Sequence, residues 1–208
     1  MYVKALERFI SALKRPDRVC RIAFRGSLEC SSQISEALDL PFPALESLEL
    51  YKMDNKSVLR ATFFMASIRS LRHLRLDAWW LTTLLPILSV TRSLVDLTLN
   101  LTIDNQPLNR PSLLAHLENM PRLRNLQVFM EFFTEEMPPS TTVLLGELTC
   151  LRFRGHPTQV GWFVAGLVLP SLRELHISFT IFVITPTLHI PYLSKLIHAT
   201  GIFFSRPD

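Results

Sequence analysis

One apolar pattern, apolar-x-x-apolar-x-apolar, occurs seven times in this chain of 208 residues. The seven occurrences start at Val19, Leu45, Leu71, Leu94, Leu123, Leu148 and Leu172. Their spacing is nearly constant, because the successive starts are 26, 26, 23, 29, 25 and 24 residues apart. A strand this short is not stable alone, so the pattern requires that successive units stack and bury their apolar positions together.

Within each unit, the last two apolar positions lie two residues apart, as Leu97 and Leu99 do. Such positions point to the same side of a strand, while the residue between them points to the other side. The intervening residues are mostly polar, namely Glu49, Arg75, Thr98, Gln127, Arg152 and His176. Repeats of about 20–29 residues with this pattern are typical of leucine-rich repeats. The sequence therefore predicts an α/β leucine-rich-repeat solenoid, an irregular horseshoe with about seven parallel strands on its concave face.

The segments between the strands are predicted to supply helices and loops on the convex face. Apolar stripes at helical spacing predict helices at 57–68, 81–90, 110–119, 157–167 and 191–199. Residues 103–110 and 131–146 read as loops, and Pro138-Pro139 makes the second one an exposed excursion. We expect a single domain over residues 1–208. It consists of an N-terminal helix and partial cap at 1–17, repeats at 18–180, and a C-terminal cap and tail at 181–208.

Composition narrows the class of protein further. Hydrophobic residues make up 48% and charged residues 19%, which indicates a folded chain. The 22 basic residues are scattered, so no polybasic tail for a membrane or for DNA is present. The first residues do not resemble a signal peptide, and the longest apolar stretches are too short to span a bilayer. These features predict an intracellular protein, cytoplasmic or nuclear, with reduced and at least half-buried cysteines at positions 20, 30 and 150.

No catalytic or metal-binding constellation stands out in the sequence. The six glycines are isolated, so there is no phosphate-binding loop. The six histidines and three cysteines show neither His-x-x-x-His nor Cys-x-x-Cys spacing. His73 and His176 fall on the polar side of their strands, where a solvated role is the simplest interpretation. We therefore predict no catalytic residues, no metal, no cofactor and no enzyme activity.

The outward residues of the predicted strands form a strip on the concave face. The strip is composed of Arg21, Arg25, Glu49, Tyr51, His73, Arg75, Asp77, Asp96, Asn100, Asn125, Gln127, Phe129, Arg152, Arg154, Glu174 and His176. All of these except Arg21, Asn125 and Glu174 are the predicted partner-binding residues. Because both signs of charge are mixed along the strip, it suits a protein partner better than a nucleic acid. Its tyrosine and arginines belong to the residue types that are enriched in binding hot spots.

Local wording adds a family resemblance. The segments 6–22, 42–48, 87–99, 169–177 and 190–197 carry it, for example Phe-Pro-Ala-Leu-Glu-Ser-Leu at 42–48 and Leu-Pro-Ser-Leu-Arg-Glu-Leu-His-Ile at 169–177. In order and spacing they resemble the leucine-rich region of F-box-like proteins of mushroom-forming fungi, over about residues 6–200. The resemblance implies the substrate-recruiting half of a ubiquitin-ligase receptor.

The chain departs from that family in two respects. No F-box is recognisable, so a ubiquitin-ligase scaffold is an expected partner only if an F-box is encoded upstream. The asparagine or cysteine expected three residues after the last strand leucine is also absent. It is replaced by Met53, Trp79, Thr102, Glu131, His156 and Thr180, which predicts irregular turns.

Three functions follow as hypotheses. The first is a non-catalytic protein–protein interaction module that uses the concave face. The alternative is a truncated or remnant repeat protein with no ligase role. A nucleic-acid binder is less favoured, although the isoelectric point of about 9.2 motivates it.

Overall fold

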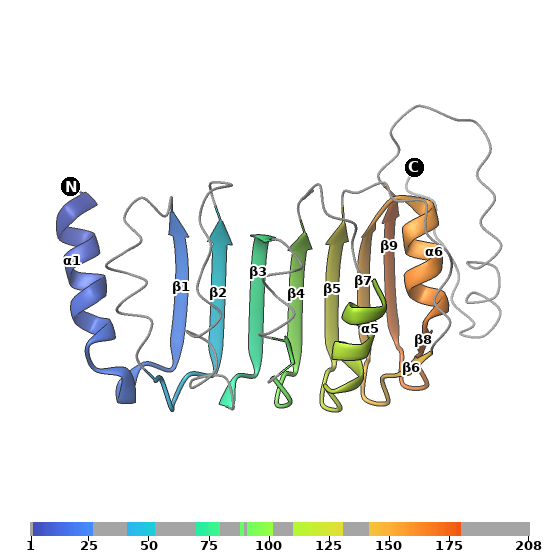
Figure 1. Ribbon diagram of the computed structural model, residues 1–208, viewed down its shortest axis with the longest axis horizontal. Coiled ribbons are helices and arrows are strands. Elements are labelled where there is room, and N and C mark those ends of the chain that lie inside the picture. Colours follow the sequence, from blue (N-terminus) through green and yellow to red (C-terminus); the bar gives the residue numbers. More distant parts are fainter. Residues whose placement is uncertain are drawn as a thin grey trace.

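The protein forms a parallel β-solenoid in which each repeat contributes one strand to a seven-stranded sheet (Figure 1). The computed structural model describes residues 2–26, 41–52, 70–79, 88–89, 91–101, 110–130 and 142–179. The strands of the sheet follow one another in sequence order and are all parallel. They are β1 (Arg21–Gly26), β2 (Ser47–Lys52), β3 (His73–Trp79), β4 (Asp96–Leu101), β5 (Asn125–Met130), β7 (Cys150–Gly155) and β9 (Glu174–Phe179). The seven predicted strands are thereby confirmed.

The register of the sheet repeats the register of the sequence pattern. Leu74 lies beside Leu97, which lies beside Leu126, so equivalent repeat positions are direct neighbours. One repeat therefore corresponds to one step between strands, from 23 residues between β3 and β4 to 29 between β4 and β5. The one irregularity in the described pairings is a register shift between Asp77 and Trp79.

The core lies on one face of the sheet, which we call the core face. The alternate residues of β4, for example Leu97 and Leu99, are buried, and the same alternation holds in β5 and β7. The leucines that begin the repeats, such as Leu94 and Leu123, join them in one continuous cluster. In β9 the inward residues are only half-buried, because the described part of the chain ends there. The opposite face, which carries the alternating polar residues, is the polar face.

Helices in the described residues lie at the N-terminal end of the sheet and on the core face. They are α1 (Tyr2–Leu13), the single turn η1 (Pro16–Arg18), α5 (Arg110–Glu118) and α6 (Pro157–Ala165). Leu114 and Leu117 of α5 and Val160 and Phe163 of α6 belong to the buried core. α5 and α6 each carry a proline in their first turn, where its missing N–H costs no hydrogen bond. None of the described helices is long and apolar enough to cross a membrane.

These helices match the sequence-based predictions where the two can be compared. The predicted N-terminal helix is present as α1. Its Phe9 ring lies 6.0 Å from that of Phe24 in β1, centroid to centroid, and its Leu13 is buried. The helices predicted at 110–119 and 157–167 are confirmed, except that Leu167 belongs to a strand. The predicted helices at 57–68 and 191–199, most of 81–90, the loop at 103–110 and the cap at 181–208 lie outside the described residues.

A second, two-stranded parallel sheet corrects the prediction for residues 131–146. β6 (Val143–Leu144) pairs with β8 (Leu167–Val168) through hydrogen bonds that the amides of Val143 and Leu145 donate to backbone carbonyls. Val143 and Leu145 are buried while Leu144 is exposed. The end of the segment is thus part of the core rather than an exposed excursion, because its apolar side chains alternate as in a half-buried strand. Residues 131–141 lie outside the described part.

Backbone hydrogen bonds make the amino-terminal edge of the sheet regular. The carbonyl of Arg72, directly before β3, accepts the amides of Val95 and Asp96 at 2.8 and 3.0 Å. The carbonyl of Val95 accepts Arg124 and Asn125 in the same way, and the arrangement recurs at each step from Cys20 to Thr149. The prediction of irregular turns is therefore wrong at this edge, where backbone groups satisfy one another without an asparagine ladder.

Candidate partner-binding face

The polar face is a grid of side chains, with three positions from each of the seven strands. The row nearest the amino-terminal edge is composed of Arg21, Ser47, His73, Asp96, Asn125, Cys150 and Glu174. The middle row is composed of Ala23, Glu49, Arg75, Thr98, Gln127, Arg152 and His176. The third row is composed of Arg25, Tyr51, Asp77, Asn100, Phe129, Arg154 and Ser178. Neighbours in a row are one strand spacing apart, about 4.8 Å.

All thirteen predicted partner-binding residues lie on this grid. The structure therefore brings together residues that are as far apart in the sequence as Arg25 and His176. Cys150 also lies on the face, in the same row as His73, although it was not singled out from the sequence. Its repeat position carried the signal, since it precedes Leu151 as His73 precedes Leu74.

On β1 to β3, the side chains of the polar face are engaged with one another. Arg21 forms an ion pair with Glu49, and the Tyr51 hydroxyl donates a hydrogen bond of 3.2 Å to the same carboxylate. The guanidinium carbons of Arg25 and Arg75 lie 5.5 and 5.1 Å from the Tyr51 ring centroid, within cation–π range. Tyr51 is thus held between two arginines.

The same holds on β3 to β5. Asp77 accepts a hydrogen bond of 2.6 Å from the Asn100 amide and lies 3.6 Å from the Arg75 guanidinium. Asp96 is bonded on one side by His73 Nδ1 and on the other by the Asn125 amide. Both carboxylates therefore have intramolecular partners, and a ligand that approaches β1 to β4 must compete with them.

The face changes character at β5 and β7. We call Gln127, Phe129, Arg152 and Arg154 the β5–β7 patch. Within the described ranges, no carboxylate forms an ion pair with either arginine, and both side chains are exposed. Phe129 lies directly beside Arg154 in the register, half-buried. The patch therefore offers two available cations and an aromatic ring side by side.

A shallow hollow adjoins this patch. Its volume is about 450 Å³, and it runs across β4, β5, β7 and β9 between the first two rows. Thr98 and Cys150 line it together with longer residues, including Gln127, Arg152 and Glu174. Small side chains between long ones leave a depression, which a side chain from a partner can enter.

Cys150 is held in its protonated form at this site. Burial raises the pKa of its thiol above the ordinary value, and Arg152 offsets this only in part. Burial likewise lowers the pKa of His156, which directly follows β7 and begins α6, so its neutral form is favoured. Cys20 is exposed, which corrects the prediction that it is at least half-buried, and Cys30 lies outside the described residues.

The two described cysteines should therefore differ in reactivity. In a Cys30→Ser background at mildly alkaline pH, we expect iodoacetamide to modify Cys20 several-fold faster than Cys150, because the thiolate is the reactive species. Mass spectrometry of tryptic peptides over time measures both rates. Equal rates would show that Cys150 is not buried on the floor of the hollow.

The described residues offer little for catalysis or metal binding. No group of three potential metal-ligating side chains occurs in that part of the chain. His73 is oriented by Asp96, but the described grid places only Ser47, Arg75 and Asp96 around it. The absence of enzyme activity stays a prediction.

Comparison with protein-family models finds no match for this chain, and comparison with curated protein sequences finds no significant similarity. The fold class defined by the coordinates is thus the parallel β-solenoid, with one strand in each repeat of about 25 residues.

Proposed function

We propose that the chain is a non-catalytic protein-interaction module whose partner binds the polar face, centred on the β5–β7 patch. The observation that carries this proposal is the contrast along the face. On β1 to β4 the charged side chains are largely paired with one another, whereas Arg152 and Arg154 are exposed without a described carboxylate partner. Exposed arginine next to an aromatic ring and a hollow is the composition of a binding hot spot.

The chemistry of the face favours a protein over a nucleic acid. Glu49, Asp77, Asp96 and Glu174 are distributed among the basic residues of the grid. A nucleic-acid backbone requires an uninterrupted basic track, because each nucleotide brings another phosphate. A protein partner can meet both signs of charge with its own complementary side chains.

We further propose that the solenoid is a leucine-rich-repeat horseshoe with the polar face on its concave side. The leucine positions, the repeat length and the placement of α5 and α6 on the core face support this. A role as the substrate-recruiting region of an F-box-like ubiquitin-ligase receptor is supported by the motif resemblance alone. The alternative, a remnant repeat protein, predicts no specific partner and a low free energy of unfolding.

The test is a charge reversal in the β5–β7 patch. The tagged chain is used to isolate partners from its native cells, and each purified candidate is titrated against the wild-type protein and against Arg152→Glu/Arg154→Glu. We expect the double variant to weaken binding at least about tenfold, since hot-spot arginines contribute about 2 kcal/mol or more. Recovery of a cullin scaffold and its F-box adaptor would support the ligase role in particular.

A matched control carries the same change in charge elsewhere. Arg15→Glu/Arg18→Glu alters two exposed arginines near η1, remote from the patch. This variant should bind like the wild-type protein, and both variants should melt within a few degrees of it. Equal weakening by the two double variants would refute a specific site at β5–β7. Failure of the wild-type chain to retain any partner would favour the remnant alternative.

A further inference from the structure

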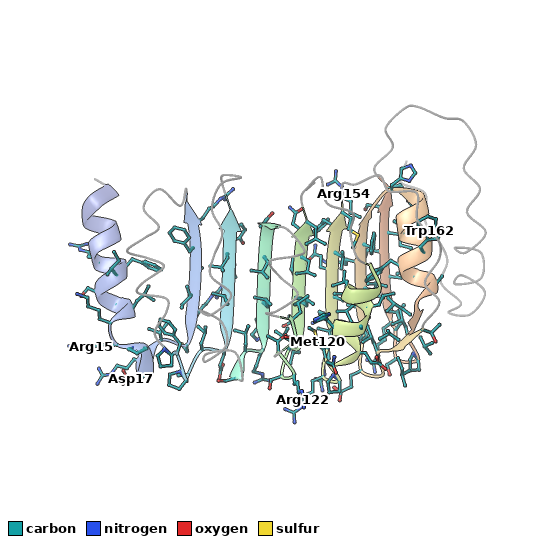
Figure 2. The ribbon with its side chains drawn as sticks, in the orientation of Figure 1. Arg15, Asp17, Met120, Arg122, Arg154 and Trp162 are labelled. Carbon is teal, nitrogen blue, oxygen red and sulfur yellow. The ribbon has the colours of Figure 1, made fainter. Side chains whose placement is uncertain are left out.

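A second hollow lies away from the polar face, at the edge where the strands begin. Its volume is about 490 Å³, and its lining includes Arg72, Val95, Arg122, Arg124 and Glu147. In Figure 2, Arg122 lies at this lower edge of the sheet, whereas Arg154 lies near the opposite ends of the strands. The two hollows share no lining residue.

The backbone ladder fixes the spacing of two of these arginines. Arg72, Val95 and Arg124 occupy the same repeat position, directly before β3, β4 and β5. The Val95 amide donates to the Arg72 carbonyl and the Arg124 amide to the Val95 carbonyl, both at 2.8 Å. Arg72 and Arg124 therefore stand two strand spacings apart, about 9.6 Å between their Cα atoms. The short, half-buried side chain of Val95 leaves the gap between them open.

The charge of this hollow is positive and largely uncompensated. Arg122 and Arg72 are exposed and form no ion pair with another described residue. Arg124, whose side chain is 62% exposed, is paired only through its Nε, 3.4 Å from the Glu147 carboxylate. Three guanidinium groups against one carboxylate give a local charge of +2, with the terminal nitrogens of Arg124 still available.

We propose that this hollow binds a single phosphate monoester carried on a side chain of a partner protein. Two arginines that lean over a gap from opposite sides can donate paired N–H groups to the oxygens of one tetrahedral dianion. The hydroxyl-bearing Ser70 and Ser93, which also line the hollow, keep its floor polar. This site does not depend on the proposed function of the polar face.

The short length of the basic stretch separates this ligand from a nucleic acid. Glu46 precedes β2, and Glu147 lies in the turn before β7, so carboxylates bound the arginines on both sides. A nucleic-acid strand carries a phosphate about every 3.4 Å and would meet these carboxylates as it ran along the edge. One isolated phosphate group fits between them.

The experiment is a titration of the isotopically labelled full chain with O-phospho-L-serine, observed through arginine Nε–Hε NMR signals. We expect saturable shifts of Arg72 and Arg124, and binding that is about threefold to fivefold weaker in Arg72→Gln, as exposed ion pairs of this kind allow. Glu147→Gln should strengthen binding. The matched control is Arg173→Gln, which removes the arginine at the equivalent position before β9, outside this hollow. It should leave binding unchanged.

Three results would overturn the proposal. The first is the absence of saturable shifts with phosphoserine. The second is equal weakening in Arg72→Gln and Arg173→Gln, which would indicate only general attraction to a basic protein. The third is tight binding of inorganic phosphate or of a single-stranded RNA oligonucleotide without binding of phosphoserine, which would assign the hollow to a free anion or a nucleic acid. Wild-type melting temperatures in every variant ensure that the comparison is made on folded protein.

Discussion

Leu97→Asp is expected to unfold the solenoid, whereas Thr98→Asp, one residue further along β4, should change its stability little. Leu97 is 1% exposed and lies between Leu74 and Leu126 in the centre of the sheet. An unpaired carboxylate there costs at least about 4 kcal/mol. That is most of the free energy of unfolding of a typical domain, about 5–15 kcal/mol. Thr98 lies on the polar face and stays in contact with solvent.

Circular dichroism during thermal unfolding separates the two variants. The wild-type chain and Thr98→Asp should show one cooperative transition at similar temperatures. Leu97→Asp should show a strongly lowered transition or none. If both variants lost the same stability, the alternation of core and polar residues in β4 would be wrong, and with it the register of the whole face.

Phe153→Ala is expected to be the most costly of the large-to-small substitutions. Phe153 of β7 is 1% exposed, and its ring packs at a tilt of 43° against that of Phe163 in α6, with centroids 4.9 Å apart. Removing the ring leaves a cavity between the sheet and the helix, which costs about 3–5 kcal/mol. Chemical denaturation monitored by fluorescence measures the difference in free energy of unfolding.

Phe129→Ala is the natural control, because it makes the same change on the adjacent strand but on the other face. Phe129 is half-buried among polar neighbours. Its truncation should cost less than about 1 kcal/mol, as is usual for surface positions. A larger loss of stability in Phe129→Ala than in Phe153→Ala would mean that the two faces of the sheet have been interchanged.

The strands and their faces were predictable because two periods in the sequence act together. Alternation within a strand separates Leu97 from Thr98, and the repeat of about 25 residues sets Leu97 beside Leu126. Cys20 shows where this signal ends. It precedes β1 at the amino-terminal edge, where the strand alternation does not yet apply, and so it is exposed rather than buried.

The interactions on the polar face were not predictable, because long side chains reach several neighbours in the grid. Arg75 contacts the ring of Tyr51, which lies diagonally from it on β2, as well as Asp77 on its own strand. A repeat pattern places these residues on one face but does not choose among such contacts. The hollow beside β5 depends in the same way on Thr98 and Cys150 being shorter than their neighbours, which becomes evident only in three dimensions.

The most direct test of the account is site-specific photocrosslinking from the two sides of the solenoid. p-Benzoylphenylalanine is placed at Gln127, in the β5–β7 patch, or at Ala115, an exposed position of α5 on the core-face side of the sheet. After irradiation with a purified partner, the account predicts a crosslinked product from position 127 and none from position 115. A product from position 115 without one from 127 would contradict a binding surface on the polar face.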